Sequence, residues 1–269
     1  MIKDITLGQY LPAESVIHRL DPRIKIILTV ALIVLVFCCQ NFALLLLFAF
    51  FVFATMAATK IRISMYLKSI KALIPIIIFT SILNAIYSTT GVVLFSFWKI
   101  TITTGGIERA VFMSSRILLL ILCSSILTYT TTPNDLTDAI ERILSPLKFI
   151  GLGNAVHIMA MMMTIALRFI PLLIEETDKI MNAQKARGVD LENGSIVKKV
   201  KAMIPILIPL FLSAIRRATD LAEAMECRCY NGGEGRRRLK QLKLSARDVL
   251  ALIICFVLLA SIITLNIIV

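Results

Sequence analysis

Two short stretches of the sequence each place one arginine among small residues, at the end of a long segment with helical character. The first stretch is Ala183–Gly188 and contains Arg187; the second is Ala224–Cys229 and contains Arg228. In both, an alanine precedes the arginine by four residues. A planar guanidinium can form paired hydrogen bonds with a carboxylate, and small neighbours let a partner surface come close. The repetition indicates two equivalent helix ends that hold two similar partners.

Ordinary helix capping is a second explanation for each stretch. A cation in the last turn of a helix complements the negative end of the helix dipole. A glycine in the place of Gly188 commonly ends a helix in the left-handed conformation. Capping is the usual role of such a stretch taken singly, whereas the pairing of two favours docking.

The residue types needed for catalysis or metal binding do not occur in a suitable pattern. The six cysteines form no C-x-x-C pair, and the two histidines are His18 and His157. The glycine-rich stretch 232–235 does not match the pattern of a nucleotide-binding loop. We therefore expect no metal site, no cofactor and no catalysis by this chain itself.

Two alternative functions stay open. An intramembrane enzyme would use Arg116, Arg168 and His157 as polar site residues. An autonomous secondary carrier would need inverted repeats and polar groups at the middle of the membrane, which are scarce in this sequence. Arg116 itself has two explanations, a functional site within the membrane or a side chain that reaches the headgroups, and the sequence does not choose between them.

The composition places these stretches on a membrane protein. Of the 269 residues, 58% are hydrophobic, whereas soluble domains contain about 45–50% apolar residues. The apolar residues occur in blocks of membrane-spanning length. The net charge of +12 could indicate nucleic-acid binding, but the interleaved aromatic and basic residues of an RNA reader are missing. We expect an all-α integral membrane protein that contacts the lipid bilayer and binds no nucleic acid.

The basic residues decide how many segments cross the membrane. Two apolar blocks, 156–174 and 202–215, are ambiguous. If both crossed, six basic residues between 175 and 201 would lie outside, against the positive-inside rule. We therefore expect about five transmembrane helices and a cytoplasmic N-terminus, with the ambiguous blocks in long helices on the cytoplasmic side. The expected spans are 24–39, 42–59, 72–87, 110–129 and 249–269.

This topology divides the chain into three regions. Residues 1–130 form an N-terminal membrane region with four transmembrane helices, residues 131–244 a cytoplasmic domain of long coupling helices, and residues 245–269 a fifth transmembrane helix. Thr132–Asp135 has the form of a capping box before an amphipathic helix. Residues 88–106 read as a loop or a short hairpin.

The sequence contains four motifs in this order: His18–Arg23, Arg168–Pro171, Ala183–Gly188 and Ala224–Gly233. Together they resemble the motifs of the transmembrane T component of energy-coupling factor (ECF) transporters. That family also holds the T subunits of cobalt-transport and biotin-transport permeases. The resemblance implies a non-catalytic, multi-pass subunit of the bacterial or archaeal cell membrane. It would join two ABC-type ATPases to a membrane-embedded substrate-binding S component, for the uptake of vitamins or transition-metal ions.

The resemblance also assigns roles to single residues. Two coupling helices of the family carry Ala-Arg-Gly signatures that dock into grooves on the ATPases. The first signature corresponds to Ala186, Arg187 and Gly188, and the second falls on Cys227, Arg228 and Cys229. Residues of the matching motifs that would support this docking are Ala183, Ala224, Arg168, Pro171, Asp21, Pro22 and Arg23.

The second signature departs from the Ala-Arg-Gly pattern. Cys227 in place of alanine is a mild change, but Cys229 stands where the family has glycine. A residue with a side chain in the left-handed conformation is strained by about 1–2 kcal/mol. We therefore expect this helix to end in another geometry or to fit its ATPase differently, and Arg187 to contribute more than Arg228.

Overall fold

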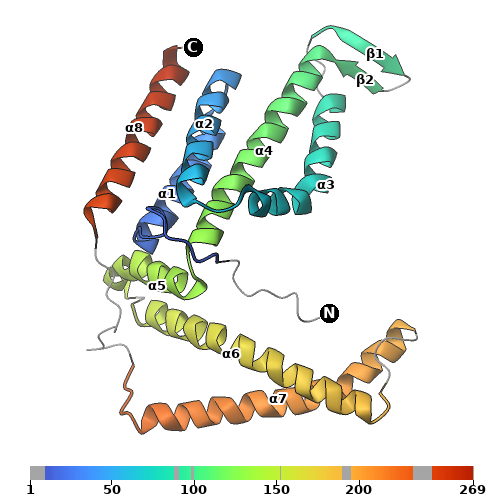
Figure 1. Ribbon diagram of the computed structural model, residues 1–269, viewed down its shortest axis with the longest axis vertical. Helices are drawn as coiled ribbons and strands as arrows, with labels where there is room; N and C mark the ends of the chain where they lie inside the picture. The colour runs from blue at the N-terminus through green and yellow to red at the C-terminus, as the bar shows by residue number, and fades with distance from the viewer. Residues whose placement is uncertain are drawn as a thin grey trace. The chain divides into compact units, whose positions relative to one another are not determined.

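The protein is described by a computed structural model that covers residues 10–87, 91–97, 100–151, 153–189, 195–232 and 244–268. Apart from one small hairpin, the regular elements in these residues are helices (Figure 1). The chain divides into two units. One, here called the bundle, consists of Gly8–Ala139 with Lys240–Val269; the other, here called the α6–α7 unit, consists chiefly of Ile140–Leu239.

Helix α4 is the central element of the bundle. Helices α1, α2 and α3 all pack against it, and α8 packs against α1 and α2. Strands β1 and β2 form an antiparallel hairpin between α3 and α4, so the short hairpin expected in residues 88–106 is confirmed. The bounds are Pro22–Cys38 for α1, Phe42–Thr59 for α2, Ile63–Tyr87 for α3, Val93–Phe97 for β1, Ile100–Thr103 for β2, Thr104–Thr130 for α4 and Ala246–Ile268 for α8.

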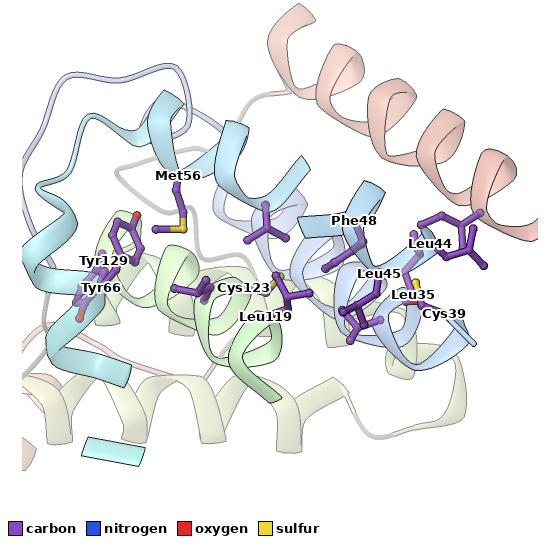
Figure 2. Close-up of a cluster of buried hydrophobic side chains, with 14 residues drawn as sticks. Leu35, Cys39, Leu44, Leu45, Phe48, Met56, Tyr66, Leu119, Cys123 and Tyr129 are labelled. Atoms are coloured by element: carbon purple, nitrogen blue, oxygen red, sulfur yellow. The ribbon is translucent and has the colours of Figure 1, made fainter. Parts of the chain in front are cut away.

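The bundle has a packed interior and an apolar exterior. Leu35 of α1, Phe48 of α2 and Leu119 of α4 are almost completely buried in one cluster of apolar side chains (Figure 2). The outer face of α2 is equally apolar, and Phe50 on that face is 77% exposed. A helix that is apolar on all its faces belongs in a membrane or in the core of a large protein. The exterior of the bundle is thus suited to lipid.

The first turn of α1 is capped as the sequence predicts and is also tied to α8. The carboxylate of Asp21 accepts a hydrogen bond from the backbone N–H of Arg23 at 2.9 Å, and Pro22 occupies the first helical position. The backbone N–H of Asp21 donates to the carboxylate of Asp248 at 2.7 Å. Asp248 also accepts from the N–H of Ser245 at 2.7 Å, at the start of α8. One buried carboxylate therefore holds the N-terminal ends of α1 and α8 together.

The segment before α1 is fixed by His18 and Lys25. The ammonium of Lys25 donates to the carbonyls of His18 at 3.1 Å and of Thr130, at the end of α4, at 2.8 Å. The ring of His18 contacts the carbonyl of Leu11 at 3.0 Å through Nε2 and the hydroxyl of Ser15 at 2.7 Å through Nδ1. Because a carbonyl only accepts, Nε2 carries the proton and Nδ1 accepts from Ser15. Burial lowers the pKa of His18, the Leu11 carbonyl opposes this effect, and the charge of Lys25 adds to it.

Arg116 of α4 has a structural role that the sequence did not reveal. Its guanidinium donates to the carbonyl of Cys39, the residue that caps the C-terminal end of α1. It also lies over the ring of Phe112, 4.7 Å from the centroid. A cation at a helix C-terminus complements the helix dipole. Arg116 thus fastens the turn between α1 and α2 to α4.

The second part of the chain is built mainly from two long helices. Helix α6 spans Gly153–Ala186 and α7 spans Ile196–Glu226. They are preceded by α5, Pro133–Leu144, and by the 3-10 helix η1, Ser145–Ile150. The capping box expected before α5 is present, because the N–H of Asp135 donates to the Thr132 hydroxyl at 3.1 Å and that hydroxyl donates to the Asp135 carboxylate at 2.8 Å.

The number of helices long enough to cross a membrane differs from the expected five. Within the described residues there are six, namely α2, α3, α4, α6, the part of α7 from Val200, and α8. Helix α1 is expected to span but has only 17 residues, while α6 and α7 reach the required length and apolarity. Length and composition do not decide whether α6 and α7 cross, so their cytoplasmic placement and the three-region division stay predictions. The chain is an α-helical, multi-pass membrane protein.

Candidate functional site

The two arginine-bearing stretches end α6 and α7, which pack against each other in opposite directions (Figure 1). Near the end of α6, the amide of Gln184 contacts the carbonyl of Pro205 at 3.4 Å. Just after the end of α7, the hydroxyl of Tyr230 lies 3.0 Å from the sulfur of Met161, close to the start of α6. The antiparallel arrangement therefore places Arg187 and Arg228 at opposite ends of the helix pair.

The first end is a Schellman motif. The N–H of Val189 donates to the carbonyl of Gln184 at 3.1 Å, and the N–H of Gly188 donates to the carbonyl of Lys185 at 3.0 Å. Gly188 has a φ of 87°. A side chain at this position would meet no atom within 4 Å, so glycine suits it because of the backbone conformation and not because of space. Arg187 is consequently held at the last position before the left-handed residue.

The second end has the same hydrogen bonds at the equivalent positions. The N–H of Tyr230 donates to the carbonyl of Met225 at 3.1 Å, and that of Cys229 donates to the carbonyl of Glu226 at 2.8 Å. Cys229 has a φ of 54° and takes the place of Gly188. Of the two alternatives expected for this helix, another end geometry is therefore contradicted, and a different fit to the ATPase stays a prediction. The chain keeps the Schellman motif although cysteine is strained in it.

The two ends are also exposed in the same pattern. Every residue of the two signatures is exposed, as are Ala183 and Ala224 one turn earlier. Within the described residues, the guanidinium of neither Arg187 nor Arg228 has a hydrogen-bond or ion-pair partner. Two matched guanidiniums on rigid helix ends are thus available to carboxylates of partner proteins.

The supporting residues divide between the two units. Arg168 and Pro171 are exposed on α6, in the same unit as the two ends. Asp21, Pro22 and Arg23 belong to the bundle, where they form the capped start of α1. The structure gives Asp21 a role in joining α1 to α8, and all three residues belong to the bundle.

Among the described residues, each residue of the enzyme alternative has different surroundings. Arg116 caps α1 within the bundle. His157, at the start of α6, lies 3.0 Å from the Glu141 carboxylate of α5. Arg168 is exposed. In the part of the chain that the structure describes, no three His, Cys, Asp or Glu residues are grouped so that they could hold a metal ion.

One contact between the helices was missed from the sequence. The guanidinium of Arg217 on α7 donates to the carboxylate of Glu176 on α6 at 3.0 Å. The signal was present, because acidic residues precede the first stretch and basic residues precede the second at the same distance. Aligning the two stretches on their arginines would have paired Glu176 with Arg217.

Comparisons with known proteins identify the family of the chain. A family model described as cobalt transport protein matches residues 13–240. The energy-coupling factor transporter transmembrane protein of Ruminiclostridium cellulolyticum is 49% identical over 93% of this chain and 92% of its own length. The same protein of Acidaminococcus fermentans is 48% identical, and that of Bacillus subtilis 41%, each over 97% of both chains. The chain therefore belongs to the family of transmembrane T components of energy-coupling factor transporters.

Proposed function

We propose that this T component is the scaffold that couples two cytoplasmic ABC-type ATPases to a membrane-embedded S component, for the uptake of vitamins or transition-metal ions. The main observation in support is the pair of matched, exposed arginine ends at opposite ends of α6 and α7. Two equivalent ends suit two similar partners. ATP binding and hydrolysis belong to the partner chains, and substrate binding belongs to the S component.

Each end is suited to a groove that contains a carboxylate. The Schellman motif fixes the backbone around Arg187 and around Arg228, so little conformational entropy is lost when the guanidinium binds. The small residues beside each arginine allow the partner backbone to come close. A bidentate guanidinium–carboxylate pair adds directionality, which an ammonium group cannot supply.

The antiparallel pair can convert movement of the ATPases into movement of the helices. When the two ATPases close on ATP, the grooves that hold the two ends approach each other. Because both ends belong to one packed helix pair, this closure reorients α6 and α7 together. The exposed apolar side chains of α7, such as Leu207 and Phe211, offer a surface through which that motion reaches the S component.

The proposal sets the orientation in the membrane. The α6–α7 unit and the N-terminus lie in the cytoplasm of a bacterial or archaeal cell, and the bundle lies in the cell membrane. The basic residues of 175–201 support this placement, because positive residues concentrate on the cytoplasmic side.

Co-purification and transport test the proposal directly. The complex with both ATPases and the S component is purified with the wild-type chain and with Arg187→Ala, Arg228→Ala and the double variant. We expect each single variant to lose one ATPase and ATP-dependent uptake, and the double variant to lose both ATPases. The matched control is Arg216→Ala, which removes an exposed arginine of α7 that lies outside the two signatures. If both ATPases stay bound to the double variant at normal expression, the two ends are capping structures only.

A further inference from the structure

The ion pair between α6 and α7 lies at the same distance from both arginine ends. Glu176 precedes Arg187 by eleven residues, and Arg217 precedes Arg228 by eleven residues. In an α-helix, eleven residues make about three turns and about 16 Å. Each signature arginine therefore lies at nearly the same height and on nearly the same face of its helix, relative to the ion pair.

This equal spacing marks the centre of an approximate two-fold relation between the helices. In an antiparallel pair with equivalent ends, a residue that contacts its own equivalent lies near the two-fold axis. Glu176 and Arg217 are equivalent when the chain is aligned on Arg187 and Arg228, and they are in contact at 3.0 Å. Two identical charges would repel each other at such a point, whereas opposite charges attract.

The helix segments between the ion pair and the arginine ends are uninterrupted. All three prolines within the two helices precede the ion pair: Pro171 in α6, and Pro205 and Pro209 in α7. A proline inside a helix removes a hydrogen bond and favours a kink. Because residues 177–186 and 218–226 contain neither proline nor glycine, each segment can act as a rigid arm.

We propose that Glu176 and Arg217 are positioning residues that join the two rigid arms at their centre and so fix the relative position of the two ATPase-docking ends. This inference rests on the proposed function. Neither side chain docks a partner itself. Their pairing makes the displacement of one end carry over to the other, and without it each arm moves separately. ATP hydrolysis would then continue with less substrate transported for each ATP.

The neighbouring residues supply matched controls. Glu175 and Arg216 differ from the proposed pair by one position, carry the same charges and are exposed. Within the described residues they form no ion pair. The side chains of Arg217 and Glu176 are 36% and 26% exposed. An ion pair with this exposure raises the ratio of paired to unpaired geometry by about two- to fivefold.

The coupling ratio in proteoliposomes tests the proposal. Uptake and ATP hydrolysis are measured together for the full complex with Glu176→Gln, with Arg217→Gln and with the charge exchange Glu176→Arg/Arg217→Glu. We expect the single variants to keep both ATPases but to transport about two- to fivefold less substrate per ATP. The charge exchange should recover most of this loss, while Glu175→Gln and Arg216→Gln should have no effect. A normal ratio in the single variants, or no recovery on charge exchange, would overturn the proposal.

A distance measurement separates this inference from the proposed function. Spin labels at Ala183 and Ala224, both exposed, report the distance between the ends in the T component alone, after the exposed cysteines Cys38, Cys227 and Cys229 are replaced by serine. We expect Glu176→Gln to broaden the distance distribution and the charge exchange to narrow it again. An unchanged distribution contradicts the positioning role even if the arginine ends dock the ATPases. A broadened distribution together with dispensable arginines contradicts the proposed function instead.

Discussion

Cys229 shows that a residue can keep a conformation for which it is poorly suited. Its φ of 54° lies in the left-handed region, where a side chain is strained, yet all the hydrogen bonds of the Schellman motif are formed. The neighbouring Cys227 has an ordinary helical φ of −58°. The two cysteines beside Arg228 therefore respond in opposite ways to replacement by glycine.

We predict that Cys229→Gly stabilises the protein and that Cys227→Gly destabilises it. The first change relieves about 1 kcal/mol of backbone strain, whereas the second adds flexibility to a helical position at a cost of about 0.5–1 kcal/mol. Thermal unfolding of the purified T component in detergent measures both. A loss of stability in Cys229→Gly would mean that its thiol makes a favourable contact that outweighs the strain.

The matched geometry changes the expected ranking of the two arginines. From the sequence, the altered flanks of Arg228 suggested a weaker contact than that of Arg187. Because both guanidiniums follow the same backbone motif with the same exposure, we now predict comparable effects of Arg187→Ala and Arg228→Ala. Each should cost about 3–5 kcal/mol of ATPase binding where the pair is buried. Titration of each ATPase against the variants measures these costs.

The lysine variants test the directionality of the same contacts. Arg187→Lys and Arg228→Lys keep the charge but lose the planar fork, so we expect little recovery of ATPase binding relative to alanine. Full recovery would show that the charge alone is recognised.

At the scale of the elements, the segment before α1 depends on a neutral histidine. The pKa of His18 is lowered from its ordinary value of 6.5, mainly by burial, so the folded state favours the neutral ring. The stability that this provides is present above pH 6.5 and is lost as the pH falls through the lowered pKa. We predict that the thermal stability of the T component decreases as the pH is lowered from 6.5 through the lowered pKa of His18.

His18→Gln separates this effect from other titrations. Glutamine can still donate to the Leu11 carbonyl and does not titrate, so the variant should be less stable at neutral pH but less sensitive to acid. An unchanged acid sensitivity would assign the loss to other groups.

Local sequence predicted helix ends better than contacts between helices. The caps at Asp21 and Thr132 follow from side chains that bond to backbone groups within three residues, and the structure contains both. The left-handed Cys229 could not be predicted, because the local preference of cysteine opposes it. The acceptor of Arg116 lies on α1 in another part of the chain, so no local pattern identifies it. Tertiary contacts decide such cases.

At the scale of the whole molecule, the distribution of basic residues predicts which of the apolar helices cross the membrane. Six helices in the described residues are long and apolar enough, but the basic residues of the α6–α7 unit oppose an external position for its connecting segment. We predict that, with Cys38 replaced by serine, a membrane-impermeant thiol reagent added outside cells labels cysteines introduced at Gln40 and Val92, which are both exposed. The native Cys227 and Cys229, also exposed, should react only after the cells are opened. Labelling of a cysteine at Lys198 from outside would contradict the cytoplasmic placement.

The carboxylate of Asp248 has a consequence for biosynthesis. The bundle is made from two separate parts of the chain, and Asp248 and Ile262, both buried in it, belong to the part that is translated last. Until α8 has been synthesised, the backbone N–H of Asp21 lacks its acceptor, and the buried apolar cluster lacks Ile262. Helices α6 and α7 are therefore complete before the bundle. A chain cut short before Ala246 would expose the unpaired end of α1, a defect by which membrane proteases can recognise and remove the incomplete protein.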